Sequence, residues 1–268
     1  MRLKIGKMPY ILKNNKIDKR YEEKFFEIIK GNLPIEKIEV FENLLTLKTN
    51  LIKEFLSDIA KTGGKLELER ERFDEILSLI FSIRRHREKI LETASIGSLD
   101  NAFGFLADSK KSVEVRTGRF LEAFPYEDVI VKRDIALEVL HFYEPEKNVL
   151  WTSWVYRQDN GTGCLPYMAD FLKRTFDGNP YIMPFSIREM KDEIDYLYEL
   201  SGKNGLNLKR PYGADILLSY MYSDYVYKMV YAESKSLSVG VPEGFTLMKK
   251  LLGIEKLEMQ RNEKSRVA

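Results

Sequence analysis

Cysteine and histidine are nearly absent from this chain of 268 residues. Cys164 is the single cysteine, which excludes a disulfide framework and a cysteine-based zinc site. A lone thiol also fits a reducing cytoplasm, which is the location we expect. The two histidines, His86 and His141, are far apart in the sequence. We therefore expect neither a histidine-rich metal site nor a catalytic triad.

An excess of charge of one sign is also missing. The 43 Lys and Arg residues nearly balance 41 Asp and Glu residues, so the net charge of +2 creates no basic field around the whole molecule. Attraction to nucleic acid would have to come from a local surface. The hydrophobic content of 44% predicts a folded chain, and its length suits one large domain or a core with an appended subdomain.

Long apolar runs are missing as well. Residues 1–7 are basic but lack the apolar stretch of a signal peptide, and no uninterrupted apolar segment is long enough to span a bilayer. We therefore expect no membrane association. Lys, Glu and Ile are abundant while Gln is scarce, a composition typical of thermophile proteins.

The first third of the chain has the apolar spacing of helices. Residues that recur at three- and four-residue steps predict helices over about 17–30, 38–59 and 66–93. Later in the chain, Ser186 and Glu189 form a capping-box pattern that predicts a helix through about Leu200.

The third predicted helix carries Arg84, Arg85, Arg87 and Lys89 near its end. Cations are favoured there by the helix dipole, and contact with DNA phosphate is the functional alternative. The charge pattern of residues 67–90 also resembles the long helices of GINS replication-scaffold proteins. That resemblance implies a non-catalytic DNA-binding or replication scaffold protein.

Two acids, Asp215 and Glu233, occupy a stretch with the composition of a β-hairpin. Residues 214–235 are rich in β-branched and aromatic side chains, and Ser223-Asp224 in the middle is a turn signal. This register would place Asp215 opposite Glu233, with Lys235 on the same face as Glu233. Opposed carboxylates lie roughly 5 Å apart and repel, so the pair favours a divalent cation such as Mg²⁺ between them.

These residues resemble the motif of the PD-(D/E)xK nucleases, the superfamily that includes most type II restriction endonucleases. Asp215 matches the Asp of the motif, Glu233 its second acid and Lys235 its Lys. The family's Pro directly precedes the Asp, whereas the nearest one here is Pro211. Short acid-x-Lys triplets are frequent in a chain of which 31% is charged, so an ion-paired strand end is the alternative interpretation.

The resemblance implies an α+β fold, an α/β/α restriction-endonuclease-like core whose mixed central sheet is flanked by helices. Residues 98–268 would form this core with inserted recognition loops, and residues 1–97 a helical N-terminal region for dimerisation or DNA contact. The implied function is Mg²⁺-dependent endonuclease activity, with a homodimer cutting a short specific site in double-stranded DNA. Asp215 and Glu233 would hold the metal, and Lys235 would stabilise charge at phosphorus.

The run of residues 110–122 resembles a second nuclease motif, in which a Ser/Arg-rich stretch precedes a Glu of the first core helix. By that match Glu122 joins the metal shell, and Arg116 and Arg119 lie near the scissile phosphate. An ordinary exposed Glu is the alternative for Glu122. Glu193 and Glu199 are rival candidates for its role.

A polar glycine loop follows the aromatic stretch of residues 148–157. Its Arg157, Gln158 and Asn160 are of the types that read purine edges in the major groove, so the loop is a candidate for sequence recognition. A plain β-turn is the alternative, because Asn-Gly most often occurs in such turns.

Overall fold

The computed structural model describes residues 15–33, 35–62, 69–176, 179–180, 186–233 and 244–267. The α-helices are α2 (Lys19–Asn32), α3 (Ile38–Thr62), α4 (Arg70–Ser78), α5 (Arg87–Thr93), α6 (Ile96–Ala107), α7 (Val113–Ala123), α8 (Val129–Tyr143), α9 (Cys164–Phe171), α10 (Ile187–Lys203), α11 (Gly213–Glu233), α12 (Gly244–Leu251) and α13 (Glu255–Val267). Two short 3₁₀ helices are η1 (Ile35–Lys37) and η2 (Phe81–Ile83). Strands β1 (Asn15–Lys16), β2 (Thr175–Phe176) and β3 (Asn179–Pro180) pair antiparallel.

The predicted α+β fold with a mixed central sheet is wrong. The chain is 73% helical, and in the described ranges strand structure is confined to the three two-residue segments β1 to β3. Residues predicted as a hairpin form α11 instead. Apolar side chains lie on every side of this helix, and Ile216, Leu217 and Leu218 are all buried. The residues of α11 prefer strands, but β propensity is a weak preference that tertiary packing can override. Burial of apolar side chains on several sides therefore stabilises the helix.

The N-terminal helices agree with their apolar spacing, with one exception. The third predicted helix is divided into α4, η2 and α5. It breaks at Ile80, whose backbone is extended (φ −104°, ψ 104°). Because of the break, the carbonyl of Leu79 lies outside the hydrogen-bonding pattern of a helix. The buried ammonium of Lys48 donates a hydrogen bond to this carbonyl at 2.8 Å. A long-range contact therefore compensates for the interruption.

The helix predicted from Ser186 is confirmed as α10, together with its capping box. The Ser186 hydroxyl accepts a hydrogen bond from the Glu189 backbone N–H at 3.1 Å. The Glu189 carboxylate accepts one from the Ser186 backbone N–H at 3.0 Å. Two otherwise unpaired donors at the helix start are thereby satisfied.

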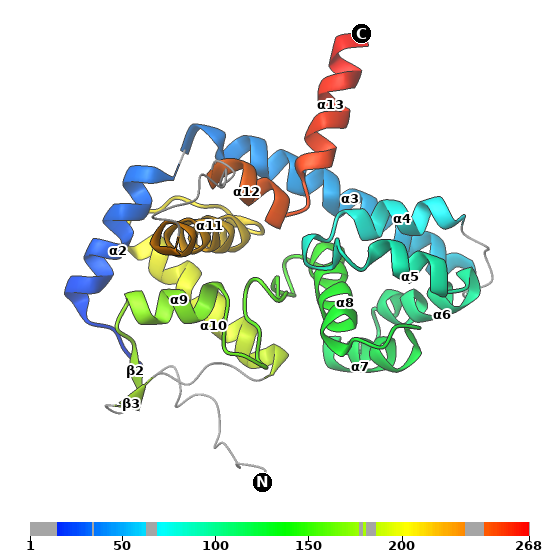
Figure 1. The fold of residues 1–268 in the computed structure, drawn as a ribbon, viewed down its shortest axis with the longest axis horizontal. Helices are drawn as coiled ribbons and strands as arrows, with labels where there is room; N and C mark the ends of the chain where they lie inside the picture. Colours follow the sequence, from blue (N-terminus) through cyan, green and yellow to red (C-terminus); the bar gives the residue numbers. More distant parts are fainter. Residues whose placement is uncertain are drawn as a thin grey trace.

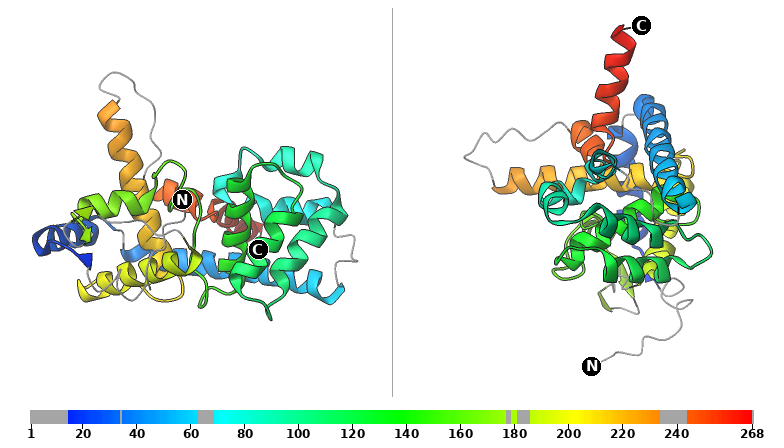
Figure 2. Two further views of the ribbon diagram at one scale, coloured as in Figure 1. Left: turned by 90° about the horizontal axis from the view of Figure 1, so that it is seen from below. Right: turned by 90° about the vertical axis from the view of Figure 1, so that its right-hand side faces the viewer.

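The helices form two groups along the length of α3. Helices α4 to α8 gather at one end of the molecule, and α2, α9, α10 and α11 at the other (Figure 1). In the left view of Figure 2, α3 runs along the lower side of the molecule from its middle toward the α4 to α8 end. Helix α3 packs on α6 and α8, so the predicted N-terminal region and core share one hydrophobic interior. The boundary at residue 97 stays a prediction.

Aromatic rings fill the interior at the α4 to α8 end. The ring of Phe103 lies 5.2 Å from Phe55 and 5.4 Å from Phe120, both nearly perpendicular to it. Edge-to-face pairs of this kind contribute about 0.5–1.5 kcal/mol each beyond the burial of their area. This cluster fixes α3, α6 and α7 against one another.

Candidate functional site

The predicted Mg²⁺ site is not assembled. Asp215 and Glu233 lie on one continuous helix, α11, 18 positions apart. At about 1.5 Å per residue the two positions are separated by roughly 27 Å along the helix axis, so α11 does not bring them together. Lys235 lies outside the described residues. The resemblance to PD-(D/E)xK nucleases is therefore contradicted, because the sheet that would bring its acids together is replaced by a helix.

Asp215 instead forms a buried ion pair with a histidine. Its Oδ2 lies 2.8 Å from Nε2 of His141, and both side chains are buried. Nδ1 of His141 donates to the carbonyl of Asn148 at 2.9 Å. Burial lowers the pKa of His141, but the charge and hydrogen bond of Asp215 outweigh it, so the pKa is raised. Both ring nitrogens are occupied, which leaves neither to act as a base or a metal ligand in this arrangement.

A second buried ion pair lies one helical turn away on α8. Lys48 of α3 places its ammonium 2.6 Å from Oε1 of Glu138, and it donates to the carbonyls of Leu79 and Leu252 at 2.8 Å each. Its three donors are thus used. Burial lowers the pKa of Lys48, against the opposing effect of Glu138. Burial also raises the pKa of Glu138, against the opposing effect of Lys48. The Lys48 ammonium thus supplies the positive charge that the buried Glu138 carboxylate requires.

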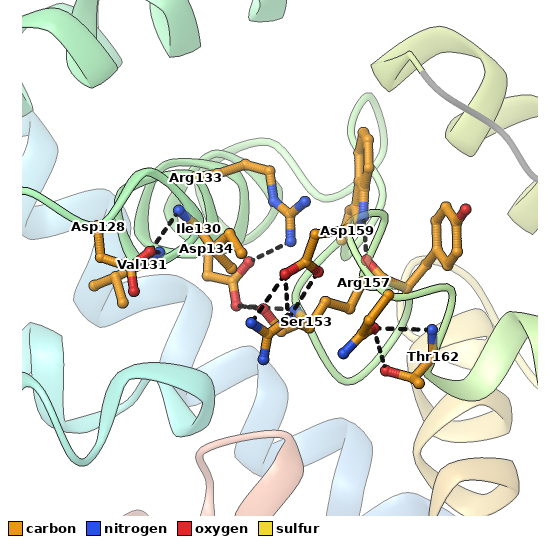
Figure 3. Close-up of polar contacts among 12 residues, drawn as sticks. Asp128, Ile130, Val131, Arg133, Asp134, Ser153, Arg157, Asp159 and Thr162 are labelled. Carbon is orange, nitrogen blue, oxygen red and sulfur yellow. Dashed lines mark hydrogen bonds and ion pairs between the residues drawn. The ribbon is translucent and has the colours of Figure 1, made fainter.

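The same face of α8 carries Asp134, which anchors the following loop (Figure 3). Its Oδ2 accepts from the backbone N–H of Ser153 at 2.9 Å and from the Ser153 hydroxyl at 2.5 Å. Its Oδ1 lies 2.9 Å from Nη2 of Arg133. The buried polar cluster, defined as Lys48, Asp134, Glu138, His141 and Asp215, therefore lies on α3, α8 and α11. Asp134 is paired with Arg133, which lies outside the cluster, and Oε2 of Glu138 has no hydrogen-bond partner among the described residues.

Sequence reasoning missed Lys48, Glu138 and His141 as members of a cluster. The signal that could have found the α8 members is their spacing. Asp134, Glu138 and His141 fall at steps of four and three, on one face of a helix whose other members are mostly apolar. Nothing local marks Lys48 as their partner, because it lies 90 positions before Glu138.

The predicted metal-shell glutamates are scattered. Glu122 is exposed on α7, and Glu199 is exposed on α10. Glu193 is buried and forms a bidentate ion pair with Arg174. Within the described ranges, no group of three or more His, Cys, Asp or Glu side chains is placed to hold a metal ion. The described members of the predicted Mg²⁺ site therefore lie on separate helices or far apart on one helix.

Arg116 and Arg119, predicted to lie near a scissile phosphate, have different environments. Arg116 is buried, with Nη2 at 2.5 Å from the Glu144 carboxylate and Nη1 donating to the carbonyl of Leu106 at 3.2 Å. Its charge is used inside the fold. Arg119 is exposed on α7, and its guanidinium carbon lies 5.8 Å from the centre of the Phe105 ring. Arg119 is thus the one of the pair that can meet a ligand.

The loop predicted to read bases is largely occupied by its own contacts. Arg157 forms a bidentate ion pair with Asp159, at 2.9 and 3.1 Å (Figure 3). The side-chain oxygen of Asn160 accepts from the backbone N–H of Thr162 at 3.1 Å and from its hydroxyl at 2.7 Å. Arg157 and Thr162 also form a β-bridge, and Gln158 is half-buried. These contacts favour the plain turn over the sequence reader.

The basic residues 84–89 begin on the turn of residues 84–86 that joins η2 to α5 and continue into the first turn of α5. Arg84 and Arg85 are exposed, and the guanidinium carbon of Arg84 lies 3.9 Å from the centre of the Phe81 ring. Burial, and then the neighbouring charge of Arg85, lower the pKa of Arg84. Arg87 pairs with Asp74 at 3.1 Å. Among the described residues, no carboxylate pairs with Arg84 or Arg85.

No family model, curated protein or solved structure matches this chain. Among the helices in the described ranges, none combines the length and apolar character needed to cross a bilayer.

Proposed function

We propose that this protein binds double-stranded DNA without cleaving it, and that the arginine-rich turn of residues 84–89 contacts the phosphates. The observation that carries the proposal is the pair of adjacent guanidinium groups on Arg84 and Arg85. Both are exposed, and neither has a carboxylate partner in the described part of the chain. Guanidinium groups match the geometry of phosphate oxygens and bind them with charge-assisted hydrogen bonds.

The surroundings of the turn support this role. The ring of Phe81 lies under the guanidinium of Arg84 and already restricts its conformations. Arg84 therefore loses less conformational entropy when it binds a phosphate. Burial lowers the pKa of Arg84 most, and the neighbouring positive charge of Arg85 lowers it further, so the two cations disfavour each other. A phosphate between them would relieve that repulsion. Lys89 of α5 is exposed and adds a third cation, whereas Arg87 is already paired with Asp74.

The proposal predicts a specific dependence on salt. Each phosphate that a protein neutralises releases counterions and contributes about −0.9 to the slope of log K against log salt concentration. Contacts from Arg84, Arg85 and Lys89 therefore give a slope of about −3. Fluorescence anisotropy with a labelled DNA duplex, at several salt concentrations, measures this slope.

The double variant Arg84→Ala/Arg85→Ala tests the assignment. It should weaken binding and make the slope less steep by about 2. The matched control is Lys24→Ala/Lys53→Ala, which removes two exposed cations from α2 and α3 and lowers the net charge equally. An equal loss of affinity in both variants would show general charge attraction, and the assignment to the turn would then be wrong.

Cleavage is tested in the same preparation. Plasmid DNA incubated with the protein and Mg²⁺ should stay intact, and a chelator should leave the affinity for the duplex unchanged. Nicking or linearisation that depends on Mg²⁺ would contradict the non-catalytic part of the proposal.

A further inference from the structure

A pocket of about 490 Å³ opens between the end of α3, α6, the loop of residues 108–110 and Arg119 of α7. This volume is in the usual range for sites that bind small molecules. Its walls are formed by Ile59, Ala60, Asn101, Gly104, Phe105, Ala107, Asp108, Ser109, Lys110 and Arg119. It lies on elements other than η2 and α5, which hold the basic turn.

The lining of the pocket carries more positive than negative charge. Arg119 and Lys110 are exposed, and neither has an ion-pair partner among the described residues. Asp108 contributes one negative charge, but its Oδ1 accepts a hydrogen bond from the Lys110 backbone N–H at 3.2 Å and so belongs to the turn itself. Two cations against one acid leave an excess of positive charge. That excess favours an anionic group of phosphate type.

The rest of the pocket is suited to a flat ring. Phe105 is half-buried in the wall, and its ring centre lies 5.8 Å from the guanidinium carbon of Arg119. Gly104 leaves space beside it, because a Cβ added there would meet its nearest atom, Cγ2 of Ile59, at an ordinary 3.8 Å. The exposed Asn101 amide makes no hydrogen bond within the described residues. A side-chain amide can pair with the edge of a purine.

We propose that this pocket binds a nucleoside monophosphate. Arg119 and Lys110 hold the phosphate, Phe105 packs on the base, and Asn101 hydrogen-bonds its edge. The pocket is larger than inorganic phosphate needs, so that ion alone would leave space along Phe105, Gly104 and Ile59 unfilled. The site is independent of the DNA contact proposed for Arg84 and Arg85.

Isothermal titration calorimetry with the four ribonucleoside monophosphates and with inorganic phosphate tests the proposal. At least one nucleotide should bind at least tenfold more tightly than inorganic phosphate. Arg119→Ala should weaken nucleotide binding at least tenfold. The matched control, Lys111→Ala, removes an exposed cation next to Lys110 that does not line the pocket, and it should leave the affinity unchanged.

Two further variants give results of opposite sign. Asp108→Asn keeps the acceptor oxygen of the turn but removes the negative charge, so nucleotide binding should become tighter. Gly104→Leu fills the space beside Phe105, so it should weaken nucleotide binding and leave inorganic phosphate binding unchanged. Thermal denaturation of each variant checks that it remains folded.

Absence of binding by all four nucleotides at millimolar concentration would overturn the proposal. Equal affinity for nucleotide and inorganic phosphate, or equal losses in Arg119→Ala and Lys111→Ala, would overturn it as well. The Arg84→Ala/Arg85→Ala variant should bind the nucleotide normally. Failure of the DNA-binding proposal therefore leaves this result intact.

Discussion

Replacing Lys48 by Met tests how far the buried polar cluster stabilises the fold. Met has a similar length but no charge and no donor. The change leaves the Glu138 carboxylate without its cation, and it leaves the carbonyls of Leu79 and Leu252 without their hydrogen bonds from the ammonium. Removing one partner of a buried ion pair typically costs about 3–5 kcal/mol. Each carbonyl left without a partner adds about 1–3 kcal/mol.

These costs are large against the free energy of unfolding of a typical domain, about 5–15 kcal/mol. We therefore expect Lys48→Met to be strongly destabilised or unfolded at neutral pH. The double variant Lys48→Met/Glu138→Leu should recover the part of the loss that comes from the uncompensated carboxylate, because apolar replacement of both partners is often neutral. The loss from the two carbonyls should remain in the double variant.

Urea denaturation followed by tryptophan fluorescence measures these differences, since Trp151 and Trp154 are both buried and will report unfolding. The control Lys53→Met changes an exposed lysine on the same helix and should shift stability by less than about 0.5 kcal/mol. The deficit of Lys48→Met should also shrink at low pH. Loss of the ammonium raises the folded-state pKa of Glu138 further, and a raised carboxyl pKa costs stability as pH rises from the unfolded-state value to the folded-state value.

Two results would refute this reasoning. One is a loss below about 1 kcal/mol in Lys48→Met, which would mean that water or rearrangement solvates the buried groups. The other is a double variant no more stable than the single one, which would mean that Glu138 is not penalised by the loss of its partner.

Two more predictions follow from other contacts. Asp215→Asn should cost more stability at pH 5.5 than at pH 9.5. The raised pKa of His141 stabilises the fold at pH values below the unfolded-state pKa, and that stabilisation is lost as pH rises through the folded-state pKa. Equal losses in urea denaturation at both pH values would contradict this prediction. Gly253→Ala should destabilise the fold by several kcal/mol. The φ of Gly253 is +66°, which costs an alanine about 1 kcal/mol of strain. A Cβ there would also lie 1.7 Å from the carbonyl oxygen of Leu79, which adds the larger part of the loss. Gly118→Ala, where a Cβ meets nothing within 4 Å in a helix, should instead stabilise by about 0.5–1 kcal/mol, and the two melting temperatures should shift in opposite directions.

The sequence predicted those elements whose stabilising contacts are local. Apolar spacing predicted α2 and α3, and the Ser186–Glu189 pair predicted the start of α10, because three- and four-residue steps express the geometry of the helix itself. Helix α11 was predicted as a hairpin. Its apolar residues surround the helix, so no periodic face distinguished it, and its aromatic and β-branched content favoured strands.

The candidate site was predicted least well for the same physical reason. Asp215 was predicted to hold a metal ion together with Glu233, so its partner was sought nearby in the chain. The actual partner, His141, lies 74 positions earlier. Contacts between distant segments depend on how helices pack, and a single sequence carries no direct record of that packing.

The hydrogen bond between Lys48 and the Leu252 carbonyl has a consequence for synthesis of the chain. These groups are 204 positions apart, so the Lys48 ammonium is synthesised long before the Leu252 carbonyl to which it donates. Until Glu138 is made, Lys48 of α3 has no carboxylate to balance its charge, and until Leu252 is made, one of its three hydrogen bonds is missing. The N-terminal helices can form in that interval, but their interior can close in its final arrangement only after Leu252 has left the exit tunnel.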